Sequence, residues 1–376
     1  MEKTLKKIPI NRWIDMLAFV FILIFPLLGF KQFRVDFMCQ VVAYIIFAIS
    51  LDLLWGYTGL MSLGHAVLFG MGGYMIGICF QIQDGAPAFM TREGINEVPS
   101  FFLPLKNETV AFIVGLLLPT AFAVFLGFFI FKSKVSGVFF TIITLALAQI
   151  AKDFVANQQA YTNGFNGLQG ILRYPVSGEP LSKIAYYYVV AAVAILVYVF
   201  CIFLTRSRFG KVAVSIRENE SRVKFLGYNP AKFKIVIFAI SGFLAGLSGL
   251  MYAPAMSSIT IEEISVTAST FVLICIAVGG RGNLTGAIVG TLLIQWAKVL
   301  LSEQCANYWQ LILGVILLLI IFFMPQGIIG KIINVQYSIK TRKSKEKILE
   351  SEENISSVSL NNKQGDEEYG NSFTGG

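Results

Sequence analysis

The sequence predicts an all-α, polytopic membrane protein with about ten transmembrane helices and with both termini in the cytoplasm. The first observation is composition: 56% of the 376 residues are hydrophobic and only 14% are charged, which leaves a soluble globule too little polar surface. The second is that the apolar residues gather in runs long enough to cross a hydrocarbon core about 30 Å thick. The third is that Lys and Arg concentrate in a few short loops.

Ten apolar runs follow one another along the chain. They are predicted as helices, because each run is close to the roughly 20 residues that a spanning helix needs, twice the length of a barrel strand. Helices also pair their own backbone groups, for which lipid offers no partner. The runs cover residues 14–30, 37–55, 60–82, 109–131, 135–156, 183–205, 235–256, 266–280, 284–302 and 309–330.

The most basic loop, 206–234, carries eight Lys or Arg residues against two Glu residues. Short cytoplasmic loops are enriched in Lys and Arg, so this loop is predicted to be cytoplasmic. Counting ten helices outward from it puts residues 1–13, the turn at 132–134, Arg281 and the tail on the same side. The acidic loops then fall on the opposite face, and the net charge of +8 needs no nucleic-acid partner.

The predicted organisation has three parts. Residues 1–13 form a cytoplasmic N-terminal segment, and the first apolar run is an anchor because it lacks a small-residue cleavage site. Residues 14–330 form the transmembrane domain. The last part, 331–376, is first basic and then rich in Ser, Asn, Glu and Gly, which is typical of a disordered tail whose basic half lies near anionic lipid headgroups.

Two apolar runs are interrupted by glycines and polar residues. The stretch LDLLWGYTGLMSLGHAVLFGMGGY, residues 51–74, holds the only histidine, His65, and AVGGRGN covers 277–283. Small residues let helices pack closely in lipid, which is one interpretation. The other is that the helices break there, and broken helices in transporters tend to mark substrate sites.

No enzyme active site is predicted. The sequence has no Walker A motif, so this chain does not hydrolyse ATP itself, and it has neither HExxH nor a paired ligand spacing for a metal. The five cysteines show no CxxC spacing. No catalytic residue, metal or cofactor is therefore predicted. Asp52, His65, Lys152 and Asp153 are the ionisable residues nearest the membrane interior, and they leave a proton relay open as an alternative.

The 206–234 loop is predicted to contain a short amphipathic helix that ends at Gly227 as its C-cap, before Asn229 and Pro230. Such a helix can lie in the lipid headgroup layer or dock into another protein. Its centre, Arg217 to Glu220, is mixed in charge, which favours docking because a lipid anchor keeps its polar face mainly basic.

Several stretches resemble the permeases of the branched-chain amino acid and urea group of ABC transporters. The resemblance runs from about residue 40 to 330 and departs from the family pattern at Ala66, at Leu145-Ala146 and at 162–168. The C-terminal stretches resemble the urea-type subunit more than the amino acid one. In chain order the stretches are LDLLWGYTGLMSLGHAVLFGMGGY, KSKVSGVFFTIITLALAQ, NGFNGL, SRFGKVAVSIRENESRVKFLGYNP, AISGFLAGLSGLMYAP, IAVGGRGNLTGAIVGTLLIQWAK and FFMPQGIIG.

This resemblance implies an inner-membrane permease subunit of an ATP-driven importer. Its expected partners are a homologous permease, two cytoplasmic ATP-binding cassette subunits and an extracytoplasmic solute-binding protein, besides membrane lipid. The 206–234 loop is then the coupling loop that docks into the ATPase. The residues expected at that contact are Arg217, Glu218, Asn219, Glu220, Leu226 and Gly227.

The same resemblance makes urea the expected substrate, with branched-chain amino acids or another amide as the alternative and a stand-alone proton-coupled carrier as a third hypothesis. Urea is neutral and needs hydrogen-bonding groups in a narrow passage, whereas a zwitterion needs charged partners or exposed helix ends. The candidate pathway residues are Tyr57, Thr58, Ser62, His65, Asn163, Asn166, Gly279 and Gly280.

Overall fold

The computed structural model describes residues 10–28, 32–133, 135, 137–176, 179–304, 308, 311, 312, 314, 315, 318, 319, 322 and 327–331. In this part the chain is mostly helical, which confirms the predicted α-helical class. The long helices are α1 (Ile10–Ile24), α2 (Gln32–Thr58), α3 (His65–Gln81), α5 (Glu108–Lys132), α6 (Gly137–Asn157), α8 (Lys183–Arg206), α11 (Pro230–Met256), α12 (Val266–Gly279) and α13 (Leu284–Gln304).

Six of these helices are long and apolar enough to cross a membrane, namely α2, α5, α6, α8, α11 and α13. Shorter apolar helices cover Ile14–Leu27, His65–Gln81 and Val266–Gly279. The run predicted at 60–82 therefore begins as a helix only at His65, because the glycine-containing break precedes it. The tenth predicted run, 309–330, lies largely outside the described residues, so the count of ten and the side of each terminus stay predictions.

Short elements connect the long helices. They are η1 (Phe25–Leu28), α4 (Ala88–Arg92), η2 (Leu103–Lys106), α7 (Gln159–Thr162), η3 (Gly164–Asn166), α9 (Arg208–Glu218), α10 (Glu220–Phe225) and η4 (Ile261–Ile264). Two antiparallel pairs of two-residue strands join β1 (Leu168–Gln169) to β4 (Ser258–Ile259) and β2 (Pro175–Val176) to β3 (Glu179–Pro180). The first pair ties the α6–α8 connection to the α11–α12 connection.

Helices α2 and α11 form the centre of the bundle. In the apolar window of α2, 89% of the residues are buried, against 17% in that of α6, so α6 is a peripheral helix with most of its surface uncovered in the described part of the chain. Helix α11 packs against α2, α3 and α5. A Cβ on Gly72 would lie 2.1 Å from the carbonyl oxygen of Gly246, so only glycine permits the contact between α3 and α11.

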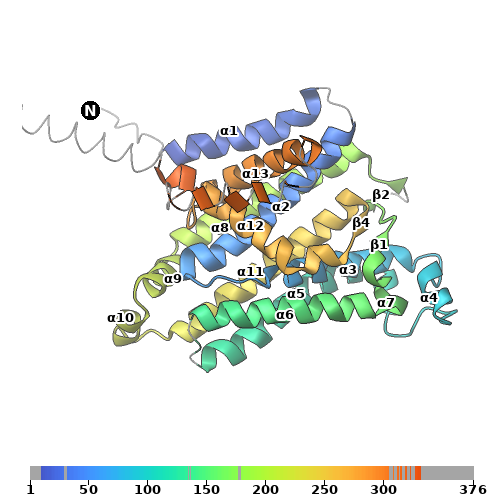
Figure 1. Cartoon of the computed structure of the whole chain (residues 1–376), viewed down its shortest axis with the longest axis horizontal. Coiled ribbons are helices and arrows are strands. Elements are labelled where there is room, and N and C mark those ends of the chain that lie inside the picture. The colour runs from blue at the N-terminus through green and yellow to red at the C-terminus, as the bar shows by residue number, and fades with distance from the viewer. Residues whose placement is uncertain are drawn as a thin grey trace, which may run out of the picture. The chain divides into compact units, whose positions relative to one another are not determined.

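The bundle has two distinct ends (Figure 1). Helices α9 and α10 lie at one end, and α4, α7 and the short strands lie at the other. The helix starts are fixed by side-chain caps: Asn107 caps α5, Ser182 caps α8 and Asn229 caps α11 ahead of Pro230. The caps fix where these three helices begin, so the polar capping residues lie in the connections at the ends of the bundle.

Candidate functional site

A helix break lies between α2 and α3, which is one of the two interpretations that the sequence left open for this stretch. Gly59 turns the chain at a φ of +77° after the end of α2. The free N–H groups beyond it are met by side chains of other helices: Leu63 donates to Thr144 Oγ1 of α6 (3.2 Å) and Ala66 donates to Ser269 Oγ of α12 (2.9 Å). Backbone groups at a helix start need such partners in lipid. Side chains of α6 and α12 therefore satisfy these two backbone N–H groups at the break.

The His65 ring is fully buried at the start of α3 and stacks on Phe47, with ring centroids 5.7 Å apart. Its Nε2 lies 3.0 Å from Ser50 Oγ and 3.2 Å from Ser241 Oγ. Both hydroxyls donate elsewhere, Ser50 to the carbonyl of Phe47 and Ser241 to the carbonyl of Ser50. Each serine has one proton, so this pattern favours the tautomer with the hydrogen on Nε2, shared between the two oxygens, while Nδ1 has no partner among the described residues. The ring thus joins α2, α3 and α11.

The other candidates in this break are placed as follows. The Thr58 hydroxyl donates to the carbonyl of Leu54 (2.5 Å), within its own helix. Ser62 is 1% exposed, and its hydroxyl has no partner among the described residues. Tyr57 is half-buried beside α8 and α9. None of the cavities described below is lined by these residues, so their role in substrate passage stays a prediction.

The second predicted break also exists, between α12 and α13. Gly280 and Gly282 have φ values of +115° and +75°, in a region that favours glycine. A Cβ on Gly279 would lie 1.8 Å from the carbonyl oxygen of Gly286, so the end of α12 packs directly on the start of α13. Gly279 and Gly280 are both buried, and the contact that Gly279 makes with Gly286 is a packing contact.

A junction connects the two breaks to α9. The Gly282 N–H donates to Asp52 Oδ1 of α2 (2.7 Å), and a Cβ on Gly56 would lie 2.5 Å from the Gly282 nitrogen. Arg217 of α9 lies over Gly59 and donates from its guanidinium to the carbonyl of Gly56. These contacts show that the Arg217 side chain faces the bundle. Asp52 is fully buried, so a cation near it reduces the free-energy cost of its charge.

The 206–234 loop holds two short helices, where a single one was predicted. Asn219 separates them, because its backbone is extended and its Oδ1 accepts from the N–H of Arg222 (3.0 Å), starting α10 afresh. Glu220 pairs with Lys224 Nζ (2.9 Å) and with Lys234 Nζ of α11 (2.6 Å). Burial raises the pKa of Glu220, but these hydrogen bonds outweigh it and hold that pKa below its usual value.

The end of α10 presents an apolar surface. Phe225 is 91% exposed, Leu226 75% and Tyr228 47%. Gly227 follows the helix at a φ of +84°, with its N–H bonded to the carbonyl of Lys224, as the predicted C-cap glycine requires. We call Phe225, Leu226 and Tyr228 the apolar tip. The predicted coupling residues thus divide. Arg217 reaches inward to Gly56 and also pairs with the exposed Glu218, with Nη2 and Oε1 2.6 Å apart. Asn219 and Glu220 shape the segment, and Leu226 faces outward.

The two asparagines predicted on the outer side lie in one tight turn. Asn163 has a left-handed φ of +59°, and its Nδ2 donates to the carbonyl of Gly167 (2.8 Å). The carbonyl of Asn166 accepts from Gln169 Nε2 (3.0 Å). The turn fixes the entry into β1, and both residues stay predictions as pathway residues.

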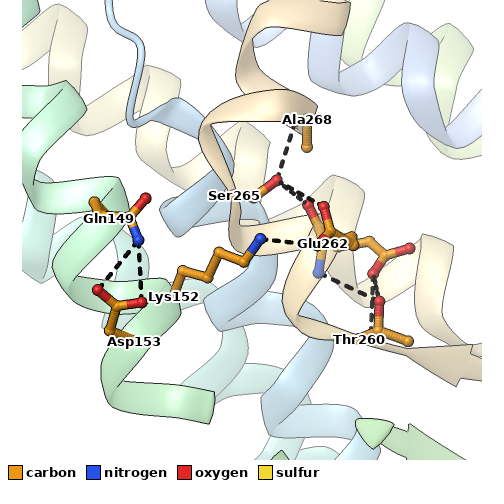
Figure 2. A network of polar contacts seen from close by, with 8 residues as sticks. Gln149, Lys152, Asp153, Thr260, Glu262, Ser265 and Ala268 are labelled. Atoms are coloured by element: carbon orange, nitrogen blue, oxygen red, sulfur yellow. Dashed lines mark hydrogen bonds and ion pairs between the residues drawn. The ribbon is translucent and has the colours of Figure 1, made fainter. Parts of the chain in front are cut away.

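Charged residues of α6 and η4 meet at the α4–α7 end of the bundle (Figure 2). Lys152 of α6 reaches across to Glu262 of η4 with Nζ and Oε1 2.8 Å apart, while Asp153 accepts from Gln149 Nε2 one turn earlier on the same helix. This network is a fixed contact between elements more than a hundred residues apart. The sequence singled out Lys152 and Asp153, but not their neighbour Glu262.

Three cavities were not predicted from the sequence. The largest, about 430 Å³, lies between α3 and α6 and is lined mainly by apolar residues such as Met71, Phe154 and Ile264. Two smaller ones, about 140 and 220 Å³, adjoin α2 and α13 and share Gln40 and Lys298. The signal available in the sequence was the presence of single polar residues inside apolar runs. Among the described residues, no group of His, Cys, Asp or Glu is arranged to hold a metal ion.

Comparison with known proteins identifies the family. The model of the family described as branched-chain amino acid transport system / permease component matches residues 33–321. The chain belongs to this permease family. It is 24% identical over 319 residues to the high-affinity branched-chain amino acid transport system permease protein LivM of Escherichia coli, covering 78% of this chain and 69% of the relative.

Two further relatives agree with the assignment. The probable branched-chain amino acid transport permease protein LivM of Methanocaldococcus jannaschii is 28% identical over 339 residues, covering 82% of this chain and 94% of the relative. The ribose import permease protein RbsC of Haemophilus influenzae is 25% identical over 214 residues, covering 55% and 65%. No solved structure matches the chain.

The family membership gives the chain its place in a transporter. It is a multi-pass permease subunit of an ABC-type importer in the cell inner membrane, and such permeases work with other permease, ATP-binding and solute-binding subunits. ATP hydrolysis belongs to the separate ATP-binding subunits. None of the relatives named above is described as a urea permease, so the expectation of urea finds no support in them.

Proposed function

We propose that this chain is the permease subunit of an ATP-driven importer for branched-chain amino acids. Two of the relatives named above are described as branched-chain amino acid permeases, which supports this substrate over urea. Branched-chain amino acids, the alternative substrate in the sequence analysis, are therefore better supported than urea.

The observation that carries the amino acid assignment is the charge inside the described spans. Lys298 lies within α13 and lines the same cavity as Glu263 of η4. Ionisable residues at such positions are costly and usually serve a substrate or ion pathway. A zwitterionic amino acid offers charges that match them, whereas neutral urea does not.

The ATPase is proposed to dock on α9 and α10. The apolar tip gives an exposed anchor on a segment that the sequence predicts to be cytoplasmic, and exposed aromatic and aliphatic side chains of this kind mark protein contact sites. Arg217 connects the same segment to both helix breaks. Movement of the ATPase subunits would thus reach α2 and the α12–α13 turn through a short, packed path.

The test is uptake by the assembled importer. Vesicles that contain this chain with its partner permease, ATP-binding and solute-binding subunits should take up radiolabelled leucine only when ATP is supplied. Isoleucine and valine should compete, and an equal concentration of urea should not. Uptake of urea in preference to leucine would overturn the substrate, and uptake by this chain without the ATPase would overturn the mechanism.

A further inference from the structure

The two cavities beside α2 and α13 differ in chemistry, although they share Gln40 and Lys298. The cavity of about 140 Å³ is lined by polar and charged groups, including Glu263 and Tyr252. The adjoining cavity of about 220 Å³ has an apolar wall made by Phe37, Met256 and Val299, and it is also lined by Asp36, which is paired with Lys183 of α8. Because the two cavities share Gln40 and Lys298, they lie side by side, and we refer to the two together as one space.

One wall of this space carries a buried donor without a partner. Gln295 lines the cavity of about 220 Å³ and is 1% exposed, yet its Nε2 has no hydrogen-bond partner among the described residues. A buried donor left unpaired costs about 1–3 kcal/mol, so an acceptor is expected beside it. Lys298 stands three residues later on α13, on the same helix face. An amide N–H and an ammonium side by side fit a carboxylate.

The opposite wall carries a fixed negative charge. Glu263 accepts from the hydroxyl of Tyr252 (3.0 Å) and from the N–H (3.0 Å) and hydroxyl (2.6 Å) of Thr260. These neutral donors hold the carboxylate in place on the wall of the cavity that Lys298 also lines. Its neighbour Glu262 is already paired with Lys152, so Glu263 is the carboxylate that fits an incoming ammonium.

We propose that this space is the binding site for an aliphatic amino acid in the zwitterionic form. The carboxylate of the ligand binds Lys298 Nζ and Gln295 Nε2, its ammonium binds Glu263, and its side chain lies against the apolar wall. The site rests on the proposed function and names the place where that substrate is recognised. The larger cavity between α3 and α6 has no charged lining residue and offers a zwitterion no partner.

The site is tested by binding of radiolabelled leucine to the purified permease and ATPase complex without the solute-binding protein. Lys298→Met keeps the length of the side chain and removes its charge, and Gln295→Glu keeps the shape and repels a carboxylate. Each should weaken leucine binding about 10- to 100-fold, as expected for the loss of a charge-assisted hydrogen bond. The matched control is Lys106→Met, an exposed lysine outside the cavities, which should bind leucine as the wild type does.

Two analogues separate recognition from a structural role. Leucinamide has the ammonium but no carboxylate, so Lys298→Met should change its competition less than twofold while it weakens leucine. If Lys298→Met weakened the binding of leucine and of leucinamide equally, the change would act through folding and the proposal would be overturned. Leucine binding within twofold of wild type in both Lys298→Met and Gln295→Glu would also overturn it. If the substituted proteins fail to co-purify with the ATPase, Gln295→Cys is labelled with a thiol reagent, and labelling that leucine does not slow overturns the site.

The proposed function fails separately. If the complete wild-type importer takes up no leucine, the substrate assignment is wrong. If it imports leucine while the Lys298 and Gln295 variants bind and import it normally, the substrate stands and only this site is wrong.

Discussion

The two helix breaks differ in the groups that satisfy them. Between α2 and α3, neutral hydroxyls from α6 and α12 meet the backbone, and serine hydroxyls of α2 and α11 hold His65. Between α12 and α13, the backbone is met by the carboxylate of Asp52, and Arg217 reaches the same junction from α9. Both breaks look alike in the sequence, since each is a glycine-rich interruption of an apolar run.

The difference separates a packing device from a connection. Among the described residues, the hydrogen bonds and ring contact of His65 are all made inside the bundle, with Ser50, Ser241 and Phe47. Arg217, from the segment proposed to meet the ATPase, contacts instead the Gly56–Gly59 end of α2 and the Asp52 junction. We therefore expect changes at the His65 contacts to act on stability and changes at the Arg217 and Asp52 junction to act on the coupling between ATP hydrolysis and transport.

The largest effect is expected from Arg217→Ala. The change removes the charged donor to the Gly56 carbonyl and a positive charge near the buried Asp52, and the loss of a hydrogen bond to a charged group costs about 1.5–3 kcal/mol. Leucine uptake by the assembled importer should therefore fall about 10- to 100-fold. ATP hydrolysis should continue, because the apolar tip still docks. The measurement is the ratio of leucine imported to ATP hydrolysed.

Arg208→Ala is the matched control for this change. Arg208 begins the same helix and is exposed, with no ion pair among the described residues, so its removal should leave that ratio within twofold of wild type. If Arg217→Ala imports leucine at the wild-type ratio, the junction does not transmit movement and the contrast between the two breaks is lost.

The next effect is expected from Leu226→Asp at the apolar tip. Leu226 is 75% exposed, so the substitution costs the isolated permease little. A charge placed in an apolar docking contact should weaken ATPase binding about tenfold or more. Co-purification and titration of the ATP-binding subunit measure this, with Leu226→Met as the conservative control. Normal ATPase affinity in Leu226→Asp would place the docking surface elsewhere.

His65→Ala tests the packing side of the comparison. Removing a fully buried ring with two hydrogen bonds should lower the free energy of unfolding by about 2–4 kcal/mol. The protein that does fold should import leucine with the pH profile of wild type, because the ring is held by neutral hydroxyls. The measurements are the thermal midpoint of the complex and uptake against pH. A shifted pH profile would give His65 a role in transport.

Ser62→Ala is the comparison variant for His65→Ala. Ser62 is buried in the same break and its hydroxyl has no partner among the described residues, so its loss should change the midpoint little. A large fall in Ser62→Ala would mean that the break depends on polar groups in general and not on the His65 contacts.

The sequence singled out both stretches, because glycine and polar residues interrupt runs that are otherwise apolar, but it left close packing and a helix break open as interpretations. The direction of Arg217 could not be predicted in this way. In the sequence it belongs to a basic loop, and only the packing of α9 on the turn after α2 shows that it faces the bundle. The apolar tip was predicted in part, through Leu226 and Gly227, because Gly227 marks the end of a helix.

The two cavities beside α2 and α13 could not be predicted from the sequence, for a related reason. Gln295 and Lys298 stand three residues apart in an apolar run, which was a usable signal, but Gln40 and Glu263 join them only through tertiary packing. The ionisable residues that the sequence brings forward, Asp52, His65, Lys152 and Asp153, suggest a proton relay instead. Which polar residues line one cavity depends on the distances between helices, and the spacing of residues in the sequence does not give those distances.

The smallest effect is expected from Glu220→Gln, which tests how firmly α10 is held to α11. The folded state lowers the pKa of Glu220 from its usual 4.5, so the carboxylate contributes stability above that pH, and the contribution is lost as the pH falls through the lowered pKa. Its side chain is 39% exposed, so water screens the pair and the loss at neutral pH should be under about 1 kcal/mol. The thermal midpoints of wild type and variant should differ slightly at neutral pH and converge in acid. In a Lys234→Met background the substitution should have less effect, because the pair is already broken. A difference that persisted in acid would show that Glu220 acts through its shape and not through its charge.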